Sequence, residues 1–248
     1  MKYQLKRLSP PSTQSGFTII ESLLAILIVT ALLVAIAPVI TLSVATRLQA
    51  RRVEQGTQAA RTYIDGVRSG KLVPPTHIRV LNEVEVVGPL GNKRFDPNRE
   101  RFSNAPAPPS ITIANCRSAA LPNFPYCRNQ PNLSLYCADF DGDDACKNSS
   151  TTDLIVQAFR SGIDTNDDGS KGYLLGVRVY RAAAFNGGTD FQTTKERGGK
   201  KVATNTGGTG DYRAPLVEMT TEVQSKPNAQ AAPEKQYEDF CDRLGGCQ

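Results

Sequence analysis

The segment from Asp164 to Ser170 carries the side chains best suited to binding a metal ion. Its sequence, DTNDDGS, fits the first half of a calcium loop, in which oxygen-bearing residues alternate along the chain and a glycine makes the turn. Calcium takes several oxygen ligands at about 2.3–2.6 Å. The candidate ligands are Asp164, Asn166, Asp168 and Ser170. Calcium at this loop is therefore a hypothesis, and no other cofactor is expected.

The same segment lacks the acid that closes a complete calcium loop, because Leu175 stands at its twelfth position. An acid from elsewhere, such as one in the cluster Asp139–Asp144, is needed to complete the ligand set. That cluster is also a weaker candidate for a calcium site of its own. The alternative for the segment is a turn without metal, since Asp, Asn and Gly all favour turns.

The chain has six cysteines, and all of them follow the apolar N-terminal stretch. They are Cys116, Cys127, Cys137, Cys146, Cys241 and Cys247. An even number on the exported side of a membrane predicts disulfides, and the spacings lack the close pairs typical of zinc sites. We expect Cys241 and Cys247 to close a C-terminal loop and the other four to pair among themselves.

A single carboxylate, that of Glu21, interrupts the apolar run from Phe17 to Ala37, which is 21 residues long. At about 1.5 Å per residue, a helix of this length crosses the ~30 Å hydrocarbon core of a bilayer. A carboxylate within the core costs about 2.5–3.5 kcal/mol on insertion scales, so Glu21 is a candidate functional residue.

Two ordinary explanations of the apolar run fit less well. A cleaved secretory signal has a shorter apolar region followed by small residues at the cleavage site, whereas Pro38 follows here. A plain signal-anchor needs no acid such as Glu21.

The helix is predicted to continue to Gly70 as an amphipathic segment covering residues 39–70, with Pro74 and Pro75 just beyond its end. Apolar and small residues recur on one face at steps of mostly three and four. For the arginines Arg47, Arg51 and Arg52 we favour a solvated face or contact with lipid headgroups. Binding of an anionic polymer is the alternative.

The remainder, residues 71–248, is predicted to be a β-rich head. Short segments with strand patterns alternate with turn signals. The expected strands are His77–Val80, Val84–Val87, Ile111–Ile113, Leu133–Tyr136, Leu154–Phe159, Tyr173–Tyr180 and Leu216–Val223. In Tyr173–Tyr180, Val177 and Val179 share one face and Arg178 and Tyr180 the other. The stretch Phe185–Gly210 is expected to be a surface loop with little order.

Catalysis and nucleic-acid binding are not expected. One histidine, no phosphate-binding glycine loop and no nucleophile motif argue against an enzyme. The net charge is +5, from 29 basic and 24 acidic residues. Without Lys2, Lys6 and Arg7, the chain has 26 basic and 24 acidic residues. This small excess of positive charge does not indicate nucleic-acid binding.

The sequence GFTIIE, from Gly16 to Glu21, follows a basic leader and opens the apolar run. This arrangement resembles the class III signal of type IV pilins and pseudopilins. The resemblance implies that a prepilin peptidase/methyltransferase cleaves between Gly16 and Phe17 and methylates the new N-terminus on Phe17. It also implies that residues 1–16 are a cytoplasmic leader, whose basic residues agree with that placement.

The resemblance further implies roles for two residues that remain after cleavage. Glu21 neutralises the terminal amine of a neighbouring subunit during assembly, and Pro38 stands where family helices bend or locally melt. The implied fold class is α+β: a long N-terminal helix, membrane-inserted over residues 17–38 and amphipathic over 39–70, packed on an antiparallel β-sheet head.

The implied function is that of a non-enzymatic minor pilin or pseudopilin in a type IV pilus-like or secretion filament. Stretches such as GYLLGVRVYR look like the pseudopilins of cyanobacterial hormogonium polysaccharide secretion, which suggests polysaccharide export and surface motility. The implied partners are other pilins, a platform protein and an ATPase. The implied location is the inner membrane, with the head in the periplasm, and then a filament. The alternatives are a monomeric membrane-tethered binding module and a major pilin of an adhesive or DNA-uptake pilus.

Overall fold

The computed structural model describes most of the long helix and the central sheet. The described residues are 16–81, 83–85, 93–95, 102, 104–108, 113, 116, 126–127, 134–162, 164–170, 172–186, 191–193, 213–224, 234 and 237–238. The chain divides into two compact units, Met1–Leu48 and Gln49–Gln248.

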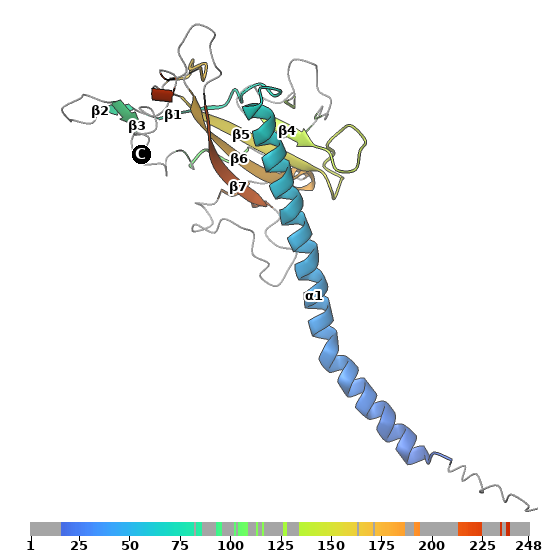
Figure 1. The fold of residues 1–248 in the computed structure, drawn as a ribbon. Helices are drawn as coiled ribbons and strands as arrows, with labels where there is room; N and C mark the ends of the chain where they lie inside the picture. The colour runs from blue at the N-terminus through green and yellow to red at the C-terminus, as the bar shows by residue number, and fades with distance from the viewer. Residues whose placement is uncertain are drawn as a thin grey trace, which may run out of the picture. The chain divides into compact units, whose positions relative to one another are not determined.

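A single helix, α1, runs from Ile19 to Arg68 and belongs to both units (Figure 1). Its first half is long and apolar enough to cross a membrane by length and composition, and none of the most apolar window is buried. In the second half, one face is buried and the opposite face is exposed. The predicted change from an all-round apolar helix to an amphipathic one is confirmed.

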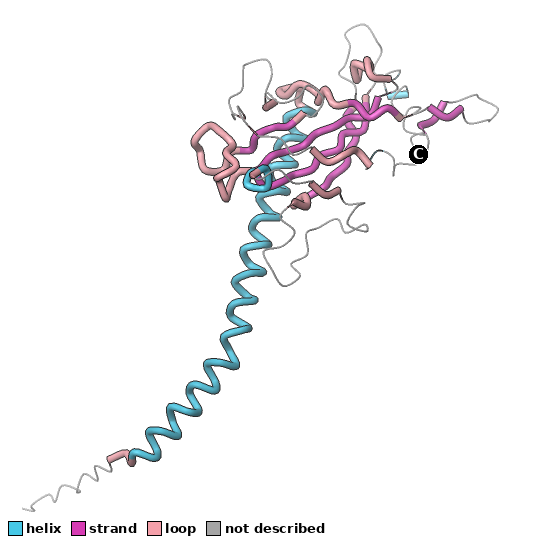
Figure 2. Tube along the Cα trace, turned by 180° about the vertical axis from the view of Figure 1, so that it is seen from behind, coloured by secondary structure: helices cyan, strands magenta, loops and turns pink. Residues whose placement is uncertain are grey.

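The second unit contains a mixed sheet of five strands (Figure 2). Its strands are β1 (Ile78–Val80), β4 (Leu135–Ala138), β5 (Leu154–Gly162), β6 (Tyr173–Arg181) and β7 (Val217–Val223). The order is β1-β5-β6-β7, and β4 pairs with β5 as well. A separate hairpin joins β2 (Glu83–Glu85) to β3 (Lys93–Phe95), and a 3-10 helix, η1 (Ala182–Phe185), follows β6.

The α+β layout is confirmed, but the expectation of a purely antiparallel sheet is wrong. The pairs β4–β5, β5–β6 and β6–β7 are antiparallel, whereas β1 is parallel to β5, with Ile78 opposite Arg160. β1 and β4 pair with different parts of the same edge of β5, because β4 covers Leu154–Gln157 and β1 covers Arg160–Gly162.

Five of the seven expected strands correspond to the strands of this sheet, and Val84–Val87 overlaps β2. Of Ile111–Ile113, only Ile113 lies within the described residues, and it is buried outside any strand. The sequence pattern missed β3 and η1. It was also wrong about part of the loop after Phe185, since Phe185, Phe191 and Thr193 are buried.

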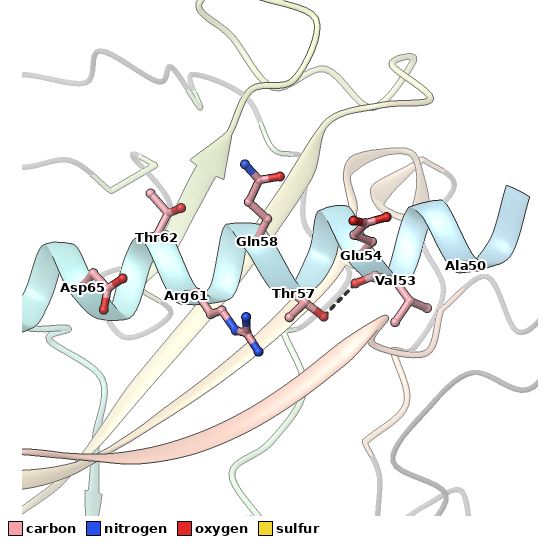
Figure 3. Close-up of a pocket in the computed structure, with 8 residues that line it drawn as sticks. All are labelled: Ala50, Val53, Glu54, Thr57, Gln58, Arg61, Thr62 and Asp65. Atoms are coloured by element: carbon pink, nitrogen blue, oxygen red, sulfur yellow. Dashed lines mark hydrogen bonds between the residues drawn. The ribbon is translucent and has the colours of Figure 1, made fainter. Parts of the chain in front are cut away.

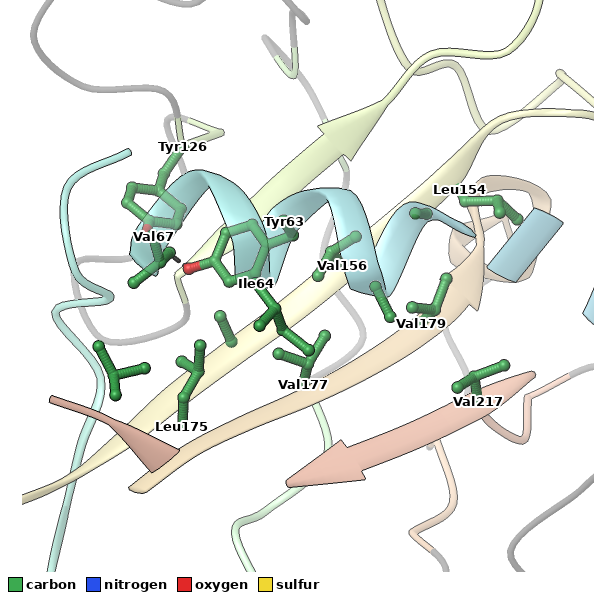
Figure 4. Close-up of a cluster of buried hydrophobic side chains, with 14 of the residues drawn as sticks. Tyr63, Ile64, Val67, Tyr126, Leu154, Val156, Leu175, Val177, Val179 and Val217 are labelled. Carbon is green, nitrogen blue, oxygen red and sulfur yellow. Dashed lines mark hydrogen bonds between the residues drawn. The ribbon is translucent and has the colours of Figure 1, made fainter. Parts of the chain in front are cut away.

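The main core lies between α1 and one face of the sheet (Figure 4). Tyr63, Ile64 and Val67 of α1 pack against valines of β5 and β6. The helix comes close to β7 because it has a glycine there: a Cβ atom on Gly56 would lie 3.3 Å from Leu216 Cβ. A larger residue at this position would force the helix away from the sheet.

The other face of the sheet is also buried, with a charged side chain at its centre. Arg178, on β6, has no exposed surface, and its Nε donates to Glu218 Oε1 at 3.0 Å. Its Nη1 donates to the carbonyl of Ala105 at 2.6 Å, and its guanidinium lies over the Phe159 ring. A buried cation needs such partners, so Arg178 fixes the segment around Ala105 onto the sheet. The predicted division of β6 into two faces is confirmed.

One disulfide lies within the segment before β4, and a second joins β4 to the segment after it. Cys116 pairs with Cys127, and Cys137, within β4, pairs with Cys146. Disulfide formation is confirmed for these four cysteines, and they pair among themselves as expected. The predicted bridge between Cys241 and Cys247 lies outside the described residues.

A pair of tyrosines connects α1 to the segment that carries Cys127. The Tyr63 and Tyr126 hydroxyls lie 2.6 Å apart, and Tyr126 donates to the carbonyl of Val73 at 2.6 Å. Because Tyr126 gives its only hydroxyl hydrogen to Val73, Tyr63 is the donor to Tyr126. Burial raises the pKa of both hydroxyls, so both stay neutral.

We predict unequal effects from removing the two hydroxyls. Tyr126→Phe leaves both the Tyr63 donor and the Val73 carbonyl without this partner, and it should lower the free energy of unfolding by about 1–3 kcal/mol. Tyr63→Phe leaves the bond to Val73 in place and should cost about 1 kcal/mol or less. Denaturant unfolding of the full chain in detergent, followed by circular dichroism, measures both. A larger loss from Tyr63→Phe would contradict the assigned direction of the bonds.

Candidate functional site

The expected cleavage position lies immediately before the first turn of α1. Gly16, Phe17 and Thr18 are not helical, and the helix begins at Ile19. Thr18 caps the helix, since its Oγ1 accepts the Glu21 backbone N–H at 3.3 Å. Phe17 is 84% exposed.

The cap gives Glu21 a local role that the sequence analysis missed. Thr18 and Glu21 have the spacing of a capping box, in which the residue three positions after the cap is Glu or Gln. An acid in the first turn is also favoured by the helix dipole. Stabilisation of the helix start is therefore an alternative to pairing with a neighbouring subunit, and the T-x-x-E pattern was the signal for it.

In the apolar half of α1, side-chain hydroxyl groups donate hydrogen bonds to backbone carbonyls of the same helix. Ser22 donates to the carbonyl of Ile19 at 2.8 Å, and Thr30 donates to the carbonyl of Ile26 at 2.9 Å. The surrounding large apolar side chains are exposed, Ile19 by 80% and Leu24 by 58%. A surface whose hydroxyl groups bond within the helix, and which has this apolar area, suits lipid or a packed bundle of helices.

Pro38 lies inside α1, and the helix continues through it. Proline removes one backbone donor, and the Thr41 hydroxyl donates to the Pro38 carbonyl at 2.9 Å one turn later. Of the two features implied for Pro38, a bend or local melting, the melting is not seen at this residue.

The Asp164–Ser170 segment forms a hydrogen-bonded turn. Asp164 Oδ1 accepts the Asn166 N–H at 2.7 Å, and Asp168 Oδ1 accepts the Ser170 N–H at 2.8 Å. Hydrogen bonds from the Ser170 side chain and backbone lower the pKa of Asp168. These are the contacts of the metal-free turn considered as the alternative.

The positively charged side chain of Arg160 also contacts this turn. The Arg160 guanidinium donates to the carbonyl of Asp167, and its Nη1 lies 3.9 Å from Asp167 Oδ1. Within the described residues, the three aspartates of the turn do not form a group close enough to hold one ion together.

A closer group of acids forms at the other acidic loop. Oxygen atoms of Asp139, Asp141 and Asp153 lie within 4.8 Å of one another, a separation that ligands of one calcium ion can have. Asp141 is exposed, whereas Asp153 is 1% exposed. The Cys137–Cys146 disulfide closes the loop that contains the first two.

Backbone donors hold these carboxylates in place. Burial acts to raise the pKa of Asp139, but hydrogen bonds from the Gly142, Asp144 and Asp141 backbone N–H groups outweigh it and lower the pKa. Asp153 accepts the N–H groups of Phe140 and Lys147. Sequence reasoning missed Asp153, because it lies directly before β5 and outside the acidic run.

His77, the one histidine of the sequence, lies beside an aromatic ring. The His77 ring lies 6.2 Å from the Phe159 ring. Burial, and then the charges of Arg79 and Arg178, lower the pKa of His77 to about 4, so its imidazole is neutral at pH 7.

No family model, curated protein or solved structure matches this chain.

We predict that calcium, where it binds, acts at Asp139, Asp141 and Asp153. Millimolar Ca²⁺ should then raise the melting temperature of the full chain over that in chelator, because an ion that binds only the folded state stabilises it. Asp141→Asn should abolish the increase, and the matched change Asp168→Asn in the other loop should leave it intact. Loss of the increase in Asp168→Asn alone would place the ion at the second loop, and equal melting temperatures with and without Ca²⁺ would contradict calcium binding.

Proposed function

We propose that this chain is a non-enzymatic minor pilin or pseudopilin, a subunit of a type IV pilus-like or secretion filament. The observation that carries the proposal is the exposed apolar half of α1, which starts directly after the Gly16–Phe17 bond and bears one acid, Glu21. A large apolar surface of this kind needs lipid or other helices to cover it.

The second unit agrees with this proposal. The buried face of α1 packs on the sheet, and its outer face remains exposed, so one helix supplies both an anchor and part of the core of a head. In the proposed location, the head lies in the periplasm, where disulfides such as Cys137–Cys146 form and persist.

The proposed partners are a prepilin peptidase/methyltransferase, other pilins, a platform protein and an ATPase. Polysaccharide export with surface motility is the proposed process, on the resemblance described above. The second candidate function, a monomeric tethered binding module, is favoured by the Thr18 cap, which explains Glu21 without any neighbour.

The proposal predicts that the N-terminus is processed. The N-terminal sequence and intact mass of the protein from native membranes should show a start at Phe17 with one added methyl group. A start at Met1 would indicate an uncleaved anchor, and a start near Val39 or beyond an ordinary secreted protein. Either of these results would contradict the proposal.

The two roles of Glu21 can be separated by substitution. Glu21→Gln keeps a residue compatible with the capping box but removes the charge. We predict that Glu21→Gln and Glu21→Ala both leave cleavage intact and both prevent incorporation into filaments, measured by immunoblotting of sheared surface fractions.

Thr18→Ala is the matched control, since it removes the cap and keeps the acid. Normal incorporation of Glu21→Gln together with defective incorporation of Thr18→Ala would show that Glu21 serves only the helix start.

A further inference from the structure

Three arginines are the first charged residues of α1 after Glu21. We call Arg47, Arg51 and Arg52 the arginine cluster. The first two are exposed and the third is half-buried. No charged residue lies between Glu21 and the cluster, and the next acid along the chain is Glu54. This part of the helix therefore carries three positive charges and no negative one.

The cluster follows directly on exposed apolar side chains. Ile40, Val44 and Leu48 are 57%, 54% and 51% exposed. The line of the helix surface that carries Ile40 and Val44 continues, at steps of three and four, to the first two arginines of the cluster. That line changes from apolar to positively charged within about one turn. Long basic side chains are found in this position where a helix passes from hydrocarbon to headgroups.

The length of the apolar stretch agrees with such a boundary. Ile19 and Leu48 are both helical and 29 residues apart in the chain, which corresponds to about 44 Å along a helix. A bilayer with its headgroups is about 40–45 Å thick. Side chains on a helix lean toward its N-terminus, so those of the cluster lean back toward the apolar stretch.

The described part of the head offers no acid to the cluster. Among the residues that the structure describes, no ion pair joins any of its three arginines to another side chain. Arg68, in the last turn of α1, differs, because it donates to Thr221 Oγ1 and to the Glu222 carbonyl on β7. An anion outside the chain can therefore bind the cluster without displacing a described partner.

Beyond the cluster, α1 carries charges of both signs. A groove there is lined by polar side chains that include Glu54, Arg61 and Asp65 (Figure 3). An anionic surface attracts Arg61 but repels the two acids, which flank it along the chain. The part of the helix that suits an anionic surface therefore ends with the cluster.

We propose that the arginine cluster binds the phosphate groups of anionic phospholipids in the leaflet on the side of the head. This inference rests on the proposed function, in which α1 crosses the membrane and the head lies in the periplasm. A guanidinium group binds phosphate through two parallel N–H···O hydrogen bonds, and the net charge of an anionic lipid adds attraction to each arginine. The contact belongs to the subunit in the membrane, because entry into a filament removes the helix from lipid.

The place of the cluster relative to the membrane is unusual. Basic residues close to a membrane span are normally more frequent on its cytoplasmic side. In the proposed orientation, Lys2, Lys6 and Arg7 lie on that side, and the cluster puts three arginines on the other. Positive charges that oppose the usual bias need a reason of their own, and phosphate binding supplies one.

A soluble anionic polymer is the other occupant that fits three arginines. The apolar side chains beside the cluster argue for lipid instead. Val44 and Leu48 would remain in water next to a polymer, whereas next to a lipid they contact acyl chains.

Lipid retention measures the preference for anionic phospholipid. The full chain, purified from native membranes, is incorporated into vesicles of equal parts phosphatidylglycerol and phosphatidylcholine and extracted in neutral detergent, and native mass spectrometry then counts the bound lipids. We expect the wild type to retain phosphatidylglycerol over phosphatidylcholine, with a contribution of roughly fivefold from each arginine. High salt during extraction should reduce the preference, since charges exposed to water are screened.

Single substitutions separate the cluster from other arginines of α1. Arg51→Gln should reduce the preference roughly fivefold, and Arg51→Lys, which keeps the charge, should retain most of it. Arg61→Gln is the matched control, because Arg61 is also exposed but lies about 15 Å farther along the helix. It should behave like the wild type. Equal losses in Arg51→Gln and Arg61→Gln, or a wild type without any preference, would overturn the proposal.

Two further outcomes identify what has failed. Dextran sulfate that displaces the retained phosphatidylglycerol from the wild type, and binds Arg51→Gln less tightly, would make the cluster a polymer site and overturn the lipid proposal. A chain that starts at Phe17 and floats with the vesicles, but shows no lipid preference, leaves the proposed function standing without this inference. A chain with an intact Met1 that does not enter the vesicles contradicts both.

Discussion

The second unit depends on the close contact between α1 and the sheet. Gly56 lets the helix backbone come near Leu216 and Val217, and the neighbouring alanines keep that distance along the next turn. The contact commits one face of the helix to the core, where Tyr63 reaches the Tyr126 hydroxyl. With this face buried, residues on the opposite face such as Glu54 and Arg61 are exposed, which is why they can be polar and charged.

The two halves of α1 differ in which side chains are buried, and their sequences differ accordingly. Over the first half, hydroxyl groups such as that of Thr30 bond within the helix, and the large apolar side chains are exposed. In the second half, burial is confined to one side. Glu21 lies at the start of the apolar run and also in the first turn of the helix, beside the Thr18 cap.

The features that local pattern controls could be predicted from the sequence. The periodicity of α1 and the alternation in β6 each follow from one short segment, and both agree with the structure. Contacts between distant segments could not be predicted in this way. The parallel pairing of β1 with β5 depends on where the chain returns, and Asp153 joins Asp139 only because β5 starts beside the acidic loop. The alternation in β6 places Arg178 on the face opposite Val177, but it does not show that the Ala105 segment covers that face.

The burial of Arg178 has a consequence for how the head unfolds. Its guanidinium is bonded to Glu218 on β7 and to the Ala105 carbonyl from a segment far away in sequence, so the departure of either removes a partner from a buried cation. Partial opening of this face is therefore costly, and its strands and the covering segment should open together in a single step. Under mechanical load, the head would therefore stay folded until it unfolded as a whole.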